Sequence, residues 1–552
     1  MNAARRDKEP RRTAHVDTFA LDRLPELQDQ PEFLFELPEL AYPDELNAAV
    51  ELLRGASPDA LAVLNSQGSW TYAQLSDLSD RIARVLVEEE GLVPGNRVLL
   101  RGPNTAMLFA AWLGVLKAGG ILVTTMPILR PGEIATLLTR AKISHAIVDE
   151  RFTSDFDAAA ASVDQPCAVL RYAGDTGKGE LEARMREVEP GFSSLAIRRD
   201  DIAMIAFTSG TTGRPKGCIQ YHRDVLACAD GFARTILKPG AGDRWTCSAP
   251  IAFTFGLGQQ LIFPLRFGGT AVTVEKPGID ALLDAIERFS VTTLATAPTA
   301  YKGMLGLLGS RDITSLRTCV SAGEHLPAAT WHAWHEATGL RIVDGIGATE
   351  MMHIFVSASG DEIRPGATGR AVPGYRACVL DESGRPLEHG TGRLAVKGPT
   401  GCRYFDDERQ KQYVQGGWNV TGDTYRKDED GYFWYVARSD DMIISAGYNI
   451  AAPEVENALY GHPAVAECAV VGVPCEERGQ LVKAYVVLAQ GFAPDEQTAA
   501  ELQAHVKRVI APYKYPREVE FVSSLPKTAT GKLQRFSLRD RSPESSVTEA
   551  PR

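Results

Sequence analysis

Short apolar runs alternate with longer amphipathic segments along most of the chain. Apolar runs at 98–100, 121–124 and 146–148 predict strands, whereas the longer segments 105–117 and 133–141 predict helices. Strands that alternate with helices in this way form parallel sheets with helices packed on their faces. The pattern therefore predicts an α/β fold in which a large N-terminal body contains mainly parallel sheets flanked by helices.

The pattern changes after the polar stretch at 436–441. The following segments predict a smaller α+β unit, with helices at 453–459 and 495–510 and strands at 468–473, 482–488 and 519–522. Residues 1–17 and 542–552 are polar, charged or rich in Ser, Glu and Pro, which predicts disordered tails. We therefore expect an N-terminal domain over 18–439 and a mobile C-terminal lid over 440–541.

Composition narrows the class of protein. Apolar residues make up 44% and charged residues 23%, as in soluble globular proteins. Lys plus Arg number 59 and Asp plus Glu 70, and the net charge of −11 disfavours a protein that coats nucleic acid. The longest apolar run, 106–116, is too short to cross a bilayer, and no apolar leader follows the basic N-terminal residues.

The nine cysteines are scattered and form no C-x-x-C pair, which argues against a disulfide framework and against a structural zinc site. Together with the charge and the absence of a leader, this pattern predicts a cytoplasmic protein. We expect its partners to be small molecules, and neither nucleic acid nor a membrane. Its oligomeric state stays open, and a homodimer is one possibility.

A phosphate-binding loop is predicted where the apolar strand at 202–207 runs into Thr208-Ser-Gly-Thr-Thr-Gly-Arg-Pro-Lys-Gly217. Glycines let the backbone approach a ligand, hydroxyl groups donate hydrogen bonds, and Arg214 and Lys216 supply positive charge. The loop lacks the spacing of a Walker A motif, which disfavours a P-loop kinase. By composition alone, it also fits a plain connection rich in Gly and Thr.

The ten residues from Thr208 to Gly217 closely resemble the signature loop of the adenylate-forming superfamily. That superfamily contains acyl- and aryl-CoA ligases, peptide-synthetase adenylation domains and firefly luciferase. Further motifs follow in the family's order from Trp70-Thr-Tyr72 to Lys532, so the resemblance covers nearly the whole chain. It implies ATP, Mg²⁺ and coenzyme A as cofactor and substrates. It also implies nucleotide contacts from Thr208, Ser209, Gly210, Thr211, Thr212, Gly213, Lys216, Ala322, Gly323, Glu324, Asp344, Gly345, Ile346, Gly347, Asp423 and Arg438.

The resemblance also implies individual roles in the nucleotide site. Glu350 would bind Mg²⁺, a hard cation that prefers oxygen ligands. Thr349 would contact the α-phosphate and Asp344 the adenine amine. Asp423 would accept hydrogen bonds from both ribose hydroxyls. Lys532 would be the catalytic lysine of adenylation, because its ammonium can offset the charge that builds up between acid and α-phosphate.

Two steps that share one small site call for a moving lid. By resemblance, Asp440 is the hinge between two lid orientations. Gly447 and Tyr448 would line the tunnel for the pantetheine arm of coenzyme A, where a bulky side chain at residue 447 would obstruct passage. Lys527 lies close to Lys532 in sequence, and we expect it to face solvent.

Within the superfamily, the motifs are most similar to those of benzoate–CoA and 2-aminobenzoate–CoA ligases. The likeness rests on the stretches 253–258, 345–355, 511–517 and 525–532. It places Phe253, Thr254, Phe255, Gly256, Gly323, His353 and Ile354 at the acyl pocket. Phenylalanine rings and an isoleucine suit a flat apolar ring.

Thr254 departs from the small apolar residue expected at its place in benzoate ligases. A hydroxyl facing the ring costs about 1–3 kcal/mol if it is left unpaired, which suggests an acid with a polar ring substituent. We therefore expect 2-aminobenzoate or benzoate as the acid, with Thr254 or His353 contacting the amine. Judged by residue type alone, His353 equally fits a histidine of the core.

Three alternatives remain from the sequence. The acid could be a medium-chain fatty acid, or the enzyme could load a carrier protein instead of coenzyme A. The chain could also be an inactive nucleotide-binding protein, although Lys216, Glu350, Asp423, Arg438 and Lys532 are all present.

Overall fold

The computed structural model describes residues 12–208, 215–438, 442–526 and 535–539. Six strands form its first sheet in the spatial order β6 (Ala168–Tyr172), β5 (His145–Asp149), β3 (Arg97–Arg101), β4 (Ile121–Thr125), β7 (Ile202–Thr208) and β8 (Lys216–Tyr221). All neighbours are parallel except β7 and β8. Helices cover both faces: α2 (Tyr72–Arg84), α3 (Ala106–Lys117), α4 (Pro131–Ala141), α5 (Thr153–Ala161) and α6 (Glu180–Glu187).

The side-chain period of a strand explains why both faces are apolar. Leu99 packs with α4 and α5 on one face, and its neighbours Val98 and Leu100 pack with α3 on the other. Every residue of α3 is buried. The strands and helices predicted between residues 98 and 148 are therefore confirmed.

Nine strands form the second sheet in the order β15 (Arg370–Ala371), β14 (Ile354–Ser357), β13 (Ile342–Gly347), β12 (Thr318–Ser321), β11 (Thr293–Thr296), β9 (Arg244–Cys247), β10 (Thr270–Val272), β1 (Leu61–Leu64) and β2 (Ser69–Thr71). From β13 to β1 the neighbours are parallel. Helices α10 (Ile279–Phe289), α11 (Pro298–Leu305) and α12 (Ala328–Thr338) pack on one face. The other face packs against α1 (Ala48–Leu53), α7 (His222–Cys228), α8 (Thr254–Leu257) and α9 (Phe263–Arg266).

A third, antiparallel sheet completes the body. Its order is β17 (Pro386–Leu387), β16 (Arg376–Leu380), β18 (Gly390–Lys397), β20 (Trp418–Lys427) and β19 (Val414–Gln415), with β21 (Phe433–Arg438) paired to β20. The short helix α13 (Gln410–Tyr413) precedes β19. The alternation of strands and helices did not predict this sheet, because most of its strands follow one another directly and α13, between β18 and β19, has only four residues.

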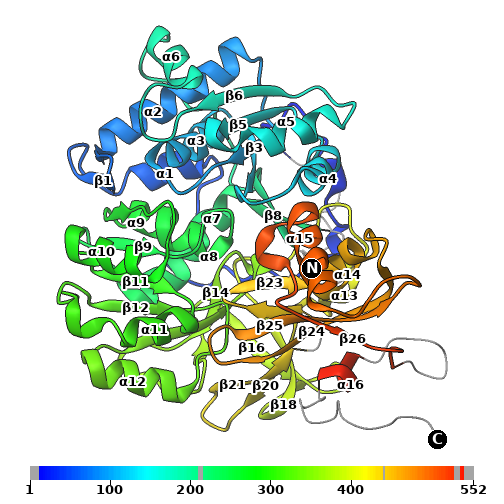
Figure 1. The fold of residues 1–552 in the computed structure, drawn as a ribbon. Helices are drawn as coiled ribbons and strands as arrows, with labels where there is room; N and C mark the ends of the chain where they lie inside the picture. The colour runs from blue at the N-terminus through cyan, green and yellow to red at the C-terminus, as the bar shows by residue number, and fades with distance from the viewer. Residues whose placement is uncertain (1–11, 209–214, 439–441, 527–534, 540–552) are drawn as a thin grey trace, which may run out of the picture.

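The C-terminal unit is a separate α+β layer, drawn from orange to red in Figure 1. Its sheet has the order β23 (Tyr448–Ala451), β22 (Met442–Ser445), β25 (Gly479–Leu488) and β24 (Val465–Cys475), with β26 (Glu518–Phe521) parallel to β25. Helices α14 (Ala452–Tyr460) and α15 (Glu496–Val509) share its core, and α16 (Arg535–Arg539) follows. The helices and strands predicted after residue 441 are confirmed.

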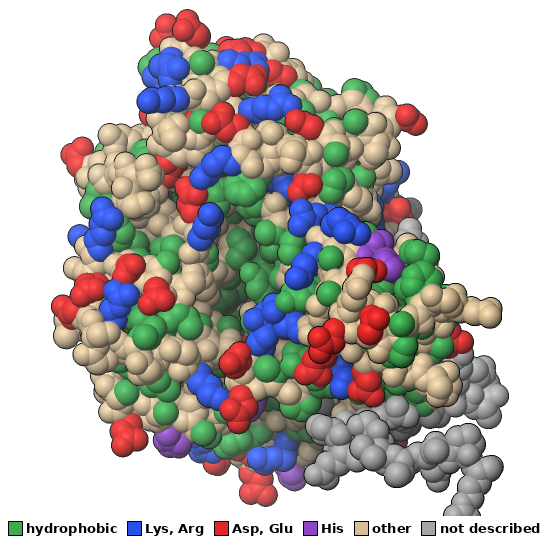
Figure 2. Space-filling view, in the orientation of Figure 1, with side chains coloured by type: hydrophobic (Ala, Val, Ile, Leu, Met, Phe, Trp, Pro, Cys, Tyr) green, Lys and Arg blue, Asp and Glu red, His purple; other side chains and the backbone are tan. Residues whose placement is uncertain are grey.

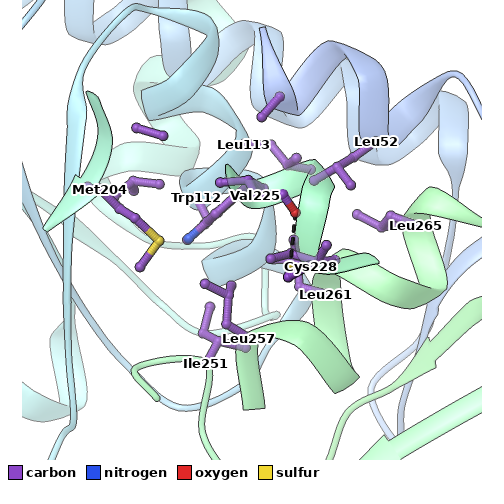
Figure 3. Close-up of a cluster of buried hydrophobic side chains, with 14 of the residues drawn as sticks. Leu52, Trp112, Leu113, Met204, Val225, Cys228, Ile251, Leu257, Leu261 and Leu265 are labelled. Carbon is purple, nitrogen blue, oxygen red and sulfur yellow. Dashed lines mark hydrogen bonds between the residues drawn. The ribbon is translucent and has the colours of Figure 1, made fainter. Parts of the chain in front are cut away.

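A large core lies beneath the α7–α9 region (Figure 3). Trp112 of α3 lies among side chains from β7, α7 and α8. Leu257 and Leu261, on α8 and the π-helical turn Gly258–Ile262, point into the same cluster. This packing fixes the segment 254–266, which forms one wall of the site described below.

Part of the expected N-terminal tail is packed against the body, so the prediction of disorder is wrong for residues 12–17. The Thr13 hydroxyl donates to Asp201 at 2.5 Å, and Asp17 forms an ion pair with buried Arg97 at 2.5 Å. These polar contacts hold a segment whose composition alone predicted a free tail. Among the helices of the described residues, none is long and apolar enough to cross a membrane.

Candidate functional site

A cavity of about 600 Å³ lies where the body meets the C-terminal unit. Figure 2 shows a hollow on this face, lined by hydrophobic side chains and surrounded by basic ones. Much of the lining follows directly after parallel strands of the second sheet: 248–250 after β9, 297 and 299–300 after β11, 322–323 after β12 and 348–349 after β13. Ligands of α/β proteins bind at the carboxyl ends of such strands.

The cavity brings together most residues expected at the acyl pocket and the tunnel. They are Phe253, Thr254, Phe255, Gly323, His353, Ile354, Gly447 and Tyr448. Three residues expected at the nucleotide also line the cavity: Ala322, Gly347 and Thr349. Gly256 does not line it, because an added Cβ there would lie 2.3 Å from the Pro250 carbonyl oxygen. Gly256 is thus a point of close backbone packing beneath the pocket.

His353 is held in a cage of aromatic rings. Its ring stacks with Phe232 at 5.3 Å and with Phe255 at 5.7 Å, and it meets Phe263 edge-on at 4.6 Å. Burial lowers its pKa to about 3, and the Phe255 backbone offsets this only in part. The imidazole is therefore neutral at physiological pH, at the border between the core and the cavity.

Thr254 is the first residue of α8, and its side chain is almost buried at the cavity wall. Phe253 precedes it and meets Tyr448 of the C-terminal unit edge-on at 6.2 Å. Tyr448 in turn stacks on Tyr513 at 4.2 Å. A row of aromatic rings therefore links the acyl wall to the C-terminal unit.

The turn between β22 and β23 closes one side of the cavity. Ala446 and Gly447 have φ values of 48° and 80°, the left-handed pair of a tight two-residue hairpin. The Gly447 amide donates to the carboxylate of Glu324 in the body. An added Cβ at Gly447 would lie 3.4 Å from the Ala297 Cβ, so the turn fits closely against the residues after β11.

A second contact joins the same two parts of the chain. The Lys514 Nζ lies 2.6 Å from Glu133 Oε1 on α4 and 2.5 Å from Glu454 Oε1 on α14. Burial alone would lower the pKa of Lys514, but Tyr513 and the two carboxylates raise it above its ordinary value. The ammonium is therefore charged and shared between one carboxylate of the body and one of the C-terminal unit.

The predicted phosphate loop connects an antiparallel pair. Thr208 ends β7 opposite Lys216, the first residue of β8. Ser209, Gly210, Thr211, Thr212 and Gly213 lie outside the described residues. Lys216 Nζ donates to the Tyr404 hydroxyl at 3.1 Å and lies 3.9 Å from Glu350 Oε1.

Two carboxylates expected to read the nucleoside lie around one tyrosine. Asp344 on β13 and Asp423 on β20 both raise the pKa of Tyr425, whose burial contributes most. Burial also raises the pKa of Asp344 to about 7, although Ser321 and the Gly345 amide lower it. Gly345 and Ile346 continue β13, and the backbone of Arg438 pairs with Asp423 across β20 and β21. Asp440 and Lys532 lie outside the described residues.

Sequence reasoning missed several residues of the cavity. Pro277, Gly278, Ile279 and Leu282 enter at the start of α10, and Ala297, Thr299 and Ala300 at the start of α11. Glu477 and Arg478 line the side of the C-terminal unit. The segments after β9 and β11 could have been predicted from their positions in the sequence, because each follows an apolar strand of a parallel sheet.

Comparison with known proteins identifies the class. Residues 54–404 match the AMP-binding enzyme family, and residues 454–532 match the C-terminal domain of AMP-binding enzymes. The benzoate–CoA ligase of Thauera aromatica is 35% identical over 513 residues, covering 91% of this chain and 97% of that protein. The chain therefore belongs to the AMP-binding enzyme family, and its predicted membership of the adenylate-forming superfamily is confirmed.

Two solved structures sharpen the comparison. The anthranilate CoA ligase AuaEII in complex with anthranoyl-AMP is 34% identical, with a TM-score of 0.71 over 91% of this chain and 98% of that chain. A double mutant of o-succinylbenzoate CoA synthetase (MenE) from Bacillus subtilis, bound with its product analogue OSB-NCoA, is 25% identical. Its TM-score is 0.80 over 91% of this chain and 99% of that chain. The predicted fold, an α/β body with a smaller α+β unit, is confirmed as that of adenylate-forming enzymes.

Proposed function

We propose that the protein is an AMP-forming aryl acid–CoA ligase whose preferred acid is 2-aminobenzoate or benzoate. The observation that carries the proposal is the cavity, which gathers Phe253, Thr254 and His353 on one wall and Thr349 and Gly447 on others. Its relatives include a benzoate–CoA ligase and an anthranilate CoA ligase. All nine cysteines are free thiols, which supports the proposed cytoplasmic location.

The reaction proceeds in two steps. A carboxylate oxygen of the acid attacks the α-phosphorus of ATP, and the bond to pyrophosphate breaks. The sulfur of coenzyme A, after loss of its proton, then attacks the acyl carbon, and the bond to AMP breaks. Lys532 serves the first step by offsetting charge on the acid and the α-phosphate, while Thr349 and Lys216 contact phosphate oxygens.

The residues present fit a Mg²⁺ ion that arrives with ATP. Glu350 offers a carboxylate near Lys216, and oxygen is the ligand type that Mg²⁺ prefers. The described part of the chain contains no cluster of three or more potential metal ligands. Such a donor set suits an ion held by one carboxylate and by substrate phosphates, where it would neutralise phosphate charge.

The arrangement of the C-terminal unit supports an assignment to the second step. The Ala446–Gly447 turn lies at the cavity, where we place the pantetheine arm, and Glu324 holds it there. The relative bound with a CoA-product analogue superposes better than the relative bound with an acyl-adenylate, with TM-scores of 0.80 and 0.71. We propose that rotation near Asp440 brings Lys532 to the site for the first step.

The cavity wall supports an aromatic acid with a polar substituent. Thr254 lines the wall and carries a hydroxyl, and a neutral imidazole such as that of His353 can donate or accept a hydrogen bond. The amine of 2-aminobenzoate could pair with either group. Benzoate has no ring substituent to pair with either group. We therefore expect a lower kcat/KM for benzoate than for 2-aminobenzoate.

The decisive experiment measures pyrophosphate release with ATP, Mg²⁺ and coenzyme A across benzoate, 2-aminobenzoate, 4-hydroxybenzoate, 4-coumarate, octanoate and acetate. We expect 2-aminobenzoate or benzoate to lead in kcat/KM by about tenfold, which is roughly 1.4 kcal/mol of transition-state preference. A lead for octanoate would show a medium-chain ligase and would refute the aryl pocket. Activity with a carrier protein and none with coenzyme A would refute the thiol assignment.

Thr254 has its own test. Thr254→Val removes the hydroxyl and keeps the volume, and Thr254→Ser keeps the hydroxyl as the matched control. We expect the ratio of kcat/KM for 2-aminobenzoate over benzoate to fall in Thr254→Val and to persist in Thr254→Ser. An unchanged ratio in both variants would assign the amine contact to another group.

A further inference from the structure

Tyr404 connects the two phosphate-binding elements of the site, although it belongs to none of the motifs that identified them. Its hydroxyl donates to Glu350 Oε1 at 2.5 Å and accepts from Lys216 Nζ at 3.1 Å. Lys216 Nζ and Glu350 Oε1 lie 3.9 Å apart, so the phenol oxygen is closer to each of them than they are to each other. Tyr404 is 1% exposed and Glu350 8% exposed, so water competes little for the contact between them, whereas the Lys216 side chain is partly exposed.

Strand β8 sets the positions of all three groups. Lys216 begins the strand, and the segment carrying Tyr404 pairs with it through Ile219 N to Arg403 O and Phe405 N to Gly217 O, both at 2.8 Å. Gln220, further along β8, donates to the Thr349 carbonyl at 2.9 Å and thereby holds the turn that carries Glu350. Strand β8 therefore fixes the positions of Lys216, Tyr404 and Glu350 relative to one another.

The Tyr404 ring is also fixed. Its backbone amide donates to Gln410 Oε1 at 2.8 Å, and its ring meets Tyr413 edge-on at 5.7 Å. A phenol has one proton to donate and can accept from a cation at the same oxygen. In this geometry the Tyr404 hydroxyl donates its proton to Glu350, and the same oxygen accepts a hydrogen bond from Lys216.

We propose that Tyr404 is a positioning residue for the adenylation step, which orients the Glu350 carboxylate toward Mg²⁺ and holds Lys216 apart from it. Without the hydroxyl, the two opposite charges can close the 3.9 Å gap into a direct ion pair. Such a pair would occupy the carboxylate needed by the metal and the ammonium needed by phosphate. The inference rests on the proposed function, because it assumes ATP and Mg²⁺ at Glu350.

Tyr404→Phe tests the role, and Tyr413→Phe is a matched control. Tyr413 is a neighbouring buried tyrosine whose hydroxyl has no hydrogen-bond partner among the described residues. The first readout is binding, by calorimetric titration of ATP with and without Mg²⁺. Because hydrogen bonds to charged groups are the strong ones, we expect Tyr404→Phe to weaken Mg²⁺-dependent ATP binding about tenfold or more. We expect Tyr413→Phe to bind like the unaltered protein.

The half-reactions separate positioning from a general structural effect. We expect Tyr404→Phe to slow acyl-adenylate formation by the same factor and to convert a supplied acyl-adenylate and coenzyme A to thioester at the unaltered rate. ATP binding equal to that of Tyr413→Phe, or an equal loss of both half-reactions with a lowered thermal midpoint, would overturn the proposal. If no acid supports pyrophosphate release, the proposed function fails, while Mg²⁺-dependent ATP binding still decides the role of Tyr404.

Discussion

Gly258 offers a direct test of the aromatic cage around His353. An added Cβ at Gly258 would lie 2.4 Å from Cδ2 and 2.6 Å from Nε2 of His353. Ordinary contacts between such atoms are about 3.5–4.0 Å, so the imidazole would have to move by about 1 Å. Phe232, Phe255 and Phe263 surround the ring, which leaves displacement toward the cavity as the open direction.

We therefore expect Gly258→Ala to destabilise the protein by about 1–3 kcal/mol, as overpacking of a filled core does. A shift of about 1 Å at the acyl wall should also lower kcat/KM for the preferred acid by up to about a hundredfold. The KM for ATP should change much less, because the displaced group is the imidazole, whereas His353 contacts the nucleotide residue Gly347 through its backbone. The measurements are pyrophosphate release with varied acid and thermal denaturation.

Gly306→Ala is the control. Gly306 has an ordinary φ of −70°, and an added Cβ there meets nothing within 4 Å. We expect it to keep both the thermal midpoint and the acid kinetics. If Gly258→Ala behaves like Gly306→Ala in both measurements, the cage does not restrain His353 and its place in the acyl wall is wrong.

Three further predictions concern the nucleotide, the lid and the lysine. The pKa of Asp344 is about 7, and its ionised carboxylate accepts more strongly from the adenine amine than the neutral acid does, so the KM for ATP should rise several-fold from pH 8 to pH 6. Asp344→Asn should flatten this dependence, and an unchanged slope would contradict the assignment. Glu133→Gln removes one of two carboxylates at Lys514, so we expect a several-fold higher KM for coenzyme A with acyl-adenylate formation preserved. Asp157→Asn, which breaks an exposed pair with Arg171, should change neither. Lys532→Ala should slow adenylation by about a hundredfold or more and spare thioester formation from a supplied adenylate, while Lys527→Ala spares both; an equal loss of both steps in Lys532→Ala would refute its role.

The sequence predicted the elements that local periodicity encodes. Residues 105–117 could be predicted as a helix because the segment is apolar throughout and lies between two strands, and the structure has it at Ala106–Lys117. The antiparallel sheet of β16 to β21 was missed because most of its strands are joined without the alternating helices on which the prediction relied. The packed segment 12–17 was missed because its contacts are with residues such as Arg97 and Asp201, far along the chain.

The residues of the candidate site also fall into two groups: those that the sequence could predict and those that depend on the folded chain. Resemblance to known motifs named Thr254, His353 and Gly447, and the cavity contains all three. Tyr404 could not be found this way, because its role depends on pairing between residues 218 and 404, which only the folded chain brings together. Residues 297–300 could have been proposed from the rule that parallel sheets bind ligands at the carboxyl ends of their strands.

Lys514 has a consequence for how the lid can move. A buried ammonium that lost its only carboxylate would face a desolvation cost of several kcal/mol, enough to lock two domains together. Lys514 has two carboxylates, and Glu454 belongs to the same unit as the lysine. When the lid leaves the body, the charge leaves with its counterion and only Glu133 stays behind. The ion pair between Lys514 and Glu133 therefore favours the lid orientation in which the two side chains meet. It remains weak enough to break in every catalytic cycle.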